Sequence, residues 1–176
     1  ITFRNLTFKH TKYSLEMDSL YTPDDGAIWM RGAQNCNIEN CKFLCCGGYA
    51  IRLSSFSNSN KILGNSVLEA GQGGVLLVSD STSEQPYDNT IAGNRIERSG
   101  KTWKHVAGIY VTTGSGNIIA HNTISDMPRY GISLKSFAPG SASHNNRIEY
   151  NRILRANLET NDTGAIETLG RDKEDT

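Results

Sequence analysis

The sequence has no long hydrophobic run and no excess of charge of either sign. No window reaches the roughly eighteen consecutive apolar residues that a transmembrane helix needs. The 18 Lys and Arg residues balance 18 Asp and Glu residues, whereas proteins that bind nucleic acid or anionic membranes need a concentrated positive field. We therefore expect neither a nucleic acid nor a membrane as partner. The first residues, Ile1–Arg4, lack the features of a signal peptide, so any such signal is expected outside this chain.

Cysteine is scarce and confined to one short stretch. Cys36, Cys41, Cys45 and Cys46 are the only four in the chain. A structural zinc site needs a second pair of ligands elsewhere, and the sequence offers none, so we expect no metal. The cluster fits buried free thiols or a disulfide, and the sequence leaves both open.

What the sequence does contain is a repeat. The pattern N-x-I-x-x-N-x-I, with one Val in place of the last Ile, is followed each time by a small residue and an alternating apolar pair. Two degenerate copies, Phe3–Phe8 and Ile38–Phe43, come first. The four clear copies are Asn60–Val67, Asn89–Ile96, Asn117–Ile124 and Asn146–Ile153.

The spacing of the copies predicts a solenoid. From Cys41 onward, the second asparagine slot recurs every 24 to 29 residues, and the shortest unit needs 23. All additional residues fall at two corners of the unit, which is typical of a repeat with a fixed core and variable loops. The short apolar runs alternate with period two and so predict strands. Because parallel strands need a crossover, such a unit must coil into an all-β parallel β-helix of about six coils.

Core occupancy supports the parallel β-helix over a β-sandwich with coincidental patterning. Four inward positions per coil hold apolar residues at 23 of 24 sites, Thr168 being the exception. The four sets are Phe3, Ile38, Ile62, Ile91, Ile119, Ile148; Phe8, Phe43, Val67, Ile96, Ile124, Ile153; Ile28, Ile51, Val75, Ile109, Ile132, Ile166; and Met30, Leu53, Leu77, Val111, Leu134, Thr168.

The repeated asparagines have a structural interpretation. An asparagine amide both donates and accepts hydrogen bonds, and asparagine tolerates tight turns. We expect two internal amide ladders, each with one asparagine per coil. The ladders are Asn60, Asn89, Asn117, Asn146 and Asn65, Asn94, Asn122, Asn151.

These repeats resemble the right-handed parallel β-helix repeats of bacterial carbohydrate-active proteins, and the resemblance covers residues 1–176 as one domain. The segment Asn161–Gly170, followed by Arg171 and Asp172, is similar to the Asp-Thr-Gly-Ala-Ile segment of β-helix glycoside hydrolases. The resemblance implies a secreted, periplasmic or cell-surface protein without a cofactor, acting on a poly- or oligosaccharide. It also implies an acidic residue that works with a second carboxylate on the following coil. We expect the chain to be truncated at both ends and that carboxylate to lie beyond Thr176.

Asp162 and Glu167 are the predicted catalytic residues. They are five residues apart, so an extended chain separates their Cα atoms by up to ~16 Å, whereas paired glycosidase carboxylates lie about 5 to 9.5 Å apart. This spacing favours a partner on a neighbouring coil. The expected substrate-binding residues lie on an exposed groove and its lips. They are Trp29, Arg52, Trp103, His105, Tyr110, Arg129, Tyr130, Arg171 and Asp172.

Two alternatives to a glycoside hydrolase remain. Arg129 and Tyr130 also suit a polysaccharide lyase or epimerase, in which an Arg neutralises and a Tyr protonates a uronate, but no Asp cluster resembles a lyase calcium site. The second alternative is a non-catalytic β-helix, such as an adhesin, a tailspike-like shaft or a sugar-binding module.

Overall fold

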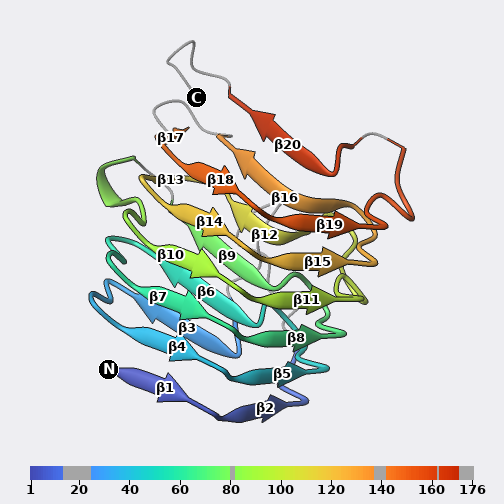
Figure 1. The fold of residues 1–176 in the computed structure, drawn as a ribbon, viewed down its shortest axis with the longest axis horizontal. Helices are drawn as coiled ribbons and strands as arrows, with labels where there is room; N and C mark the ends of the chain where they lie inside the picture. The colour runs from blue at the N-terminus through green and yellow to red at the C-terminus, as the bar shows by residue number, and fades with distance from the viewer. Residues whose placement is uncertain (14–24, 80–81, 137–141, 162, 171–176) are drawn as a thin grey trace.

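Short parallel strands wind into stacked coils throughout the computed structural model, which describes residues 1–13, 25–79, 82–136, 142–161 and 163–170 (Figure 1). Three six-stranded sheets, here called A, B and C, run along the stack, and each coil contributes one strand to each sheet. Sheet A consists of β1 (Thr2–Arg4), β4 (Asn37–Glu39), β7 (Lys61–Leu63), β10 (Thr90–Ala92), β14 (Ile118–Ala120) and β18 (Arg147–Glu149). Sheet B consists of β2 (Thr7–Lys9), β5 (Lys42–Leu44), β8 (Ser66–Leu68), β11 (Arg95–Glu97), β15 (Thr123–Ser125) and β19 (Arg152–Leu154).

Sheet C lies behind the other two in Figure 1. It consists of β3 (Ile28–Arg31), β6 (Ile51–Ser54), β9 (Val75–Val78), β12 (Ala107–Val111), β16 (Tyr130–Lys135) and β20 (Ile166–Leu169). A short pair, β13 (Gly114–Ser115) and β17 (Ser143–His144), lies at the corner between sheets C and A. The described residues hold one 3₁₀ turn, η1 (Thr82–Glu84), and no helix among them is long and apolar enough to span a membrane.

The strand register confirms the right-handed parallel β-helix. Every strand pair is parallel, and in sheet A Ile38, Ile62, Ile91, Ile119 and Ile148 pair in succession. The other three predicted inward sets pair in the same way in sheets B and C. A β-sandwich consists of two antiparallel sheets, so that alternative is excluded.

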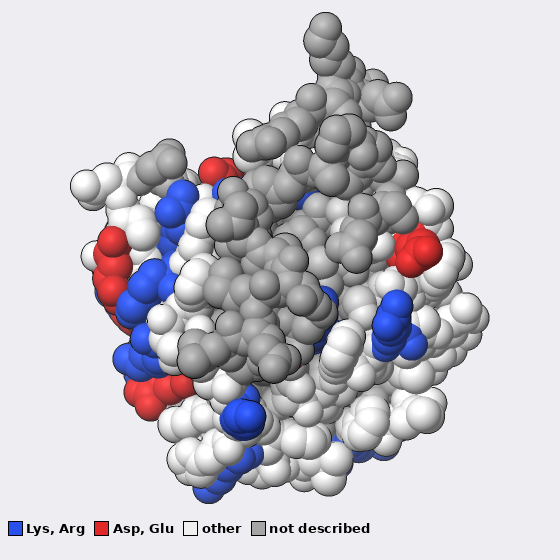
Figure 2. Space-filling model, turned by 180° about the vertical axis from the view of Figure 1, so that it is seen from behind, with Lys and Arg blue, Asp and Glu red and all other residues white. Residues whose placement is uncertain are grey.

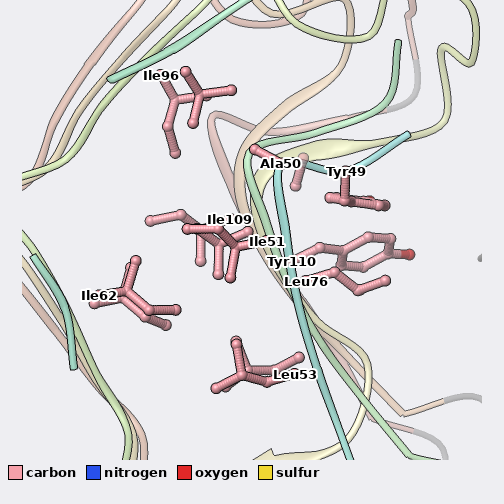
Figure 3. Close-up of a cluster of buried hydrophobic side chains, with 14 of the residues drawn as sticks. Tyr49, Ala50, Ile51, Leu53, Ile62, Leu76, Ile96, Ile109 and Tyr110 are labelled. Atoms are coloured by element: carbon pink, nitrogen blue, oxygen red, sulfur yellow. The ribbon is translucent and has the colours of Figure 1, made fainter. Parts of the chain in front are cut away.

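The inward side chains form one continuous core (Figure 3). In the middle coils these side chains are completely buried, and between the first two coils Phe8 stacks on Phe43 at a centroid distance of 5.0 Å. Inward residues of the outermost coils have a neighbouring coil on one side only, so Ile166 remains 48% exposed.

Both asparagine ladders are present. The Asn94 amide donates to Asn122 Oδ1 (2.9 Å) and to the Ile62 carbonyl (2.9 Å), while its own Oδ1 accepts from the backbone and side chain of Asn65 (2.9 and 3.0 Å). Asn89 bonds in the same way to Asn117 and Asn60. Each buried amide therefore has its donors and acceptor satisfied by the adjacent coils.

The turn geometry differs from the expectation in one detail. The ladder asparagines themselves do not adopt positive φ; the residue before each one does, as in Gly64, Gly93, His121 and Tyr150. The left-handed backbone turns the chain at the corner, and the following asparagine then points inward. Asparagine therefore suits the ladder position because of the hydrogen bonds that its amide makes, and not because it tolerates positive φ.

The small residue of each repeat is required at the corner between sheets B and C. A Cβ atom at Gly74 would lie 2.6 Å from Ile96, and one at Gly108 or Gly131 would lie equally close to Ile124 or Ile153. Real Cβ atoms do not approach so closely, because interiors are already packed at crystal density. The core isoleucines of sheet B therefore exclude a large side chain here.

The four cysteines are free thiols, which decides between the two possibilities that the sequence left open. Cys36 and Cys41 occupy the ladder positions of the second coil, where their backbone N–H groups donate to Asn60 and Asn65 (both 2.9 Å). They end the two ladders, because a thiol cannot replace the amide. Cys46 is also buried, and burial raises the pKa of its thiol, while Cys45 is exposed.

A column of alternating charge follows sheet B. Glu69, Arg98, Asp126 and Arg155 occupy equivalent positive-φ positions in successive coils. Arg98 pairs with Glu69 (3.2 Å), and Arg155 makes a two-point contact with Asp126, one bond of which measures 2.9 Å. Figure 2 shows a column of basic side chains beside acidic ones along one edge of the molecule. The Arg155 contact holds the pKa of Asp126 at about 2.

We expect Asn94→Ala to lower the free energy of unfolding by about 1–3 kcal/mol, because the amide and backbone groups it serves would lose a buried partner. Urea unfolding measures the effect. Asn37→Ala, on the outer face of β4, is the control and should change stability by less than about 0.5 kcal/mol. Equal losses for the two variants would mean that the ladder adds nothing to stability.

We also expect an acid-dependent contribution from Asp126. Because its pKa is depressed in the folded state, the stabilisation is complete above its ordinary pKa and is lost as the pH falls from about 4 to about 2. Asp126→Asn should therefore lose less stability over that interval than the wild type, by a small margin because the pair is near the surface. Thermal unfolding at about pH 5, 4, 3 and 2 tests this. A parallel pH dependence in both proteins would refute the assignment.

Candidate functional site

The outer face of sheet C carries most of the residues that the sequence singled out. One outward position per coil forms a row through Trp29, Arg52, Leu76, Tyr110, Ser133 and Glu167, in register from β3 to β20. The two ends of this row differ from its middle. Trp29 and Glu167 are partly exposed, whereas Arg52, Leu76, Tyr110 and Ser133 are buried.

The burial of Arg52 and Tyr110 differs from the expected open groove. Tyr110 packs with Leu76 and Tyr49 on the side of the strands opposite the isoleucine core (Figure 3). Residues of the first coil lie against the corner of the second: the Thr11 carbonyl accepts a hydrogen bond from Gly47 N (3.1 Å), and Asp25 lies over Gly48. Arg52 and Tyr110 are buried and therefore do not line an open groove.

Tyr49 is a buried residue that the sequence analysis missed. Tyr49 directly precedes the small residue Ala50. Its ring fills the space that a side chain at Gly73 would need, because Tyr49 Cε1 lies 2.5 Å from the position that a Cβ atom of residue 73 would take. Burial raises the pKa of Tyr49 well above its ordinary value; Tyr110 and Asp25 add to the increase, and Arg52 opposes it. The first four coils therefore hold a tyrosine cluster with a nearby Asp and Arg.

Trp29 and Arg52 lie together at the first end of the face. The Arg52 guanidinium is 5.0 Å from the Trp29 ring centroid, and Trp29 Nε1 donates to Ser54 Oγ (2.8 Å). Trp29 is 46% exposed. This arrangement presents a fixed indole surface with a cation beneath it.

Glu167 lies at the other end, held by a buried lysine. Lys135 Nζ is 2.7 Å from Glu167 Oε2 and donates to the Tyr130 hydroxyl (2.8 Å). The same ammonium lies 4.4 Å from the Tyr130 ring centroid, and Ser133 Oγ is 3.4 Å from Glu167 Oε2. The Lys135 side chain is 5% exposed and that of Glu167 26%. The carboxylate is thus oriented from within while remaining accessible to solvent.

Arg129 and His105 lie beside the same tyrosine. The Arg129 guanidinium is 4.7 Å from the Tyr130 centroid, and the His105 ring is 6.1 Å from it. Tyr130 itself is fully buried. The structure therefore brings five residues together at this end: His105, Arg129, Tyr130, Lys135 and Glu167. Sequence analysis missed Lys135, although it follows Ser133 by two positions and so belongs to the same outward face.

Other predicted site residues lie apart from this cluster. Trp103 packs against the hydrophobic core, and its backbone N donates to Gly71 O (2.9 Å). Trp29 and Arg52 lie on β3 and β6, and β3 is five strand spacings from β20, or about 24 Å. Asp162, Arg171 and Asp172 lie outside the described residues.

The described carboxylates next to this face do not make a close pair with Glu167. Asp25 precedes β3 at the far end of the sheet, and Glu159 binds Lys104 (3.0 Å) at the edge. Within the described ranges, no group of three or more His, Cys, Asp or Glu residues is placed to hold a metal ion. The chemistry available at this end is that of one oriented carboxylate with a buried lysine, an arginine and a histidine nearby.

Comparison with known proteins gave one finding. Neither the curated proteins nor the solved structures contain a match. The model of the right-handed β-helix region matches residues 1–96 and 26–168, and the two overlapping matches reflect the internal repeat. Together they cover nearly all of the coils described above. The chain therefore belongs to the right-handed β-helix family.

Proposed function

We propose that this β-helix protein binds a poly- or oligosaccharide along the outer face of sheet C and hydrolyses it as a glycoside hydrolase. The observation that carries the proposal is the Glu167 carboxylate, which is accessible to solvent and fixed from below by Lys135 and Ser133. Glycoside hydrolysis requires a carboxylate in a defined position beside the scissile bond. The resemblance of Asn161–Gly170 to the acidic segment of β-helix glycosidases supports the same assignment.

Glu167 would act as nucleophile or base, because its ammonium partner stabilises negative charge on the carboxylate. Hydrolysis needs a second carboxyl group as the acid. We assign that role to an acidic residue of a neighbouring coil, because the five-residue spacing of Asp162 and Glu167 does not favour a direct pair. Asp162 is the alternative to Glu167 as nucleophile or base. Arg129 and His105 would contact sugar hydroxyls beside the scissile bond, and Trp29 would stack on a more distant sugar. A polysaccharide substrate fits a secreted or cell-surface location.

The lyase or epimerase alternative receives less support. It needs Tyr130 to protonate the substrate, and Tyr130 is fully buried beneath Arg129 and Lys135. A polymer that lies on the surface would not reach its hydroxyl group. A non-catalytic sugar-binding β-helix is distinguished by experiment.

We expect Glu167→Gln to lower the turnover of polysaccharide by at least about 100-fold without changing the fold, and Asp162→Asn to do so in its place if Asp162 is the nucleophile. Release of reducing ends from a polysaccharide panel by the intact protein measures turnover. Glu149→Gln is the matched control, since Glu149 lies in the same coil on sheet A and pairs with Arg147 (3.1 Å). Binding without any release of reducing ends, in wild type and variants alike, would establish a sugar-binding module instead.

Lys135 should act as a positioning residue for Glu167. We expect Lys135→Met to lower kcat by about tenfold or more with a smaller change in KM, because the carboxylate would lose its fixed orientation. Lys135→Arg should restore part of the activity, because it keeps a cation beside the carboxylate. An unchanged kcat in Lys135→Met, or no recovery in Lys135→Arg, would show that the ion pair is only structural.

A further inference from the structure

The corner between sheets A and B has one residue per coil at positive φ. The six residues are Asn5, Asn40, Gly64, Gly93, His121 and Tyr150. Asparagine and glycine are the residues that tolerate this backbone best. Histidine is also found at positive φ more often than most residues, whereas tyrosine is uncommon there. The last two positions of the column thus carry rings where the preceding four carry asparagine or glycine.

The two aromatic rings form a stack at this corner. The His121 and Tyr150 centroids are 5.0 Å apart, with 8° between the ring planes, and Tyr150 is 76% exposed. The separation is close to the ~4.8 Å spacing between coils, so the rings stack along the solenoid axis. One face of His121 is covered by Tyr150, and its other face is directed toward the Gly93 position of the preceding coil. Figure 1 shows this corner where β10, β14 and β18 lead into β11, β15 and β19.

The two glycines leave a notch next to the His121 ring. A Cβ atom at Gly93 would meet a single atom within 4 Å, Gly64 N at 3.8 Å, so the space above Gly93 is open. At Gly64 a Cβ would lie 2.7 Å from Asn40 Oδ1, which shows that the Asn40 amide extends over Gly64. The notch thus has the His121 ring as one wall and the Asn40 amide as the other. Along the solenoid axis the two walls lie level with Gly64 and with His121, which are two coil spacings, or about 10 Å, apart.

The sides of the notch have different polarity. Leu63 and Ala92, at the ends of β7 and β10, are partly buried apolar residues on one side. Arg95, at the start of β11, lies on the other side with its guanidinium 2.7 Å from Glu97. A ligand in the notch would meet an aromatic face on one side, an amide on the other and a charged pair at its flank.

We propose that this notch is a second carbohydrate-binding site, which takes one pyranose ring of a neutral glycan chain. The ring's C–H face would stack on His121, supported from behind by Tyr150, and its hydroxyl groups would bond to the Asn40 amide and the Arg95–Glu97 pair. A pyranose ring presents one apolar face and a polar edge, which matches the aromatic wall and the polar flank. The choice of a sugar as ligand rests on the proposed function, while the site itself lies on a different corner from Glu167.

Binding of neutral hexasaccharides to the intact protein tests the proposal. Cellohexaose, laminarihexaose and mannohexaose are titrated by calorimetry and by amide NMR, in which shifts should appear at Gly64, Gly93 and His121. Gly93→Asn should weaken binding by about tenfold or more, because asparagine accepts the backbone and fills the notch. Gly32→Asn is the matched control: Gly32 has φ 62° and an open Cβ position like Gly93 (φ 65°), but lies at another corner.

A second pair of variants removes the ring. His121→Ala should also weaken binding by about tenfold, whereas Phe56→Ala, which removes another exposed aromatic residue at positive φ (58°), should not. Glu167→Gln should leave this binding unchanged, so the notch and the sheet C site are judged separately. The proposal is overturned if none of the three hexasaccharides binds. It is equally overturned if binding survives both Gly93→Asn and His121→Ala.

Discussion

The structure depends on one constraint: each residue has its equivalents in the adjacent coils as neighbours, about 4.8 Å away along the axis. A side chain is therefore stable only if it can pack against, or bond to, a similar one. Branched apolar residues meet this condition inside the coil, where Ile62, Ile91 and Ile119 lie in register. Asparagine meets it at the corners, because one amide carries both a donor and an acceptor. Where Cys36 and Cys41 occupy those positions the ladders end.

On the surface the same constraint acts against charges of equal sign. Like charges in successive coils repel, and the column after sheet B avoids this by placing Glu69, Arg98, Asp126 and Arg155 in alternation. Sheet C differs, because the middle of its outer face is buried. There the buried part of the row consists of Arg52, Leu76, Tyr110 and Ser133, and the more exposed Trp29 and Glu167 lie at its two ends. The partly exposed Glu167, paired with the buried Lys135, is a consequence of that distribution.

Functional candidates arise where the stacking pattern is interrupted. Glu167 follows Ser133 and Tyr110 in the outward row, and of the six residues that form that row it alone carries a carboxylate. His121 and Tyr150 replace the glycines of the preceding coils and turn a narrow corner into a flat aromatic surface beside an open notch. In a solenoid each residue contacts only the adjacent coils, so a departure from the repeat is compensated by its immediate neighbours.

The sequence by itself determined the coil, its register, both asparagine ladders and the place of the small residue, because each of these features repeats and period analysis detects repetition. It also placed Glu167 on the outer face of sheet C, since residues alternate across a strand. Only the tertiary structure decided that Arg52 and Tyr110 are buried, that Lys135 orients Glu167 and that Tyr49 fills the space over Gly73. These outcomes depend on contacts between side chains of different coils. Such contacts do not follow a period, so the chain carries no local signal for them.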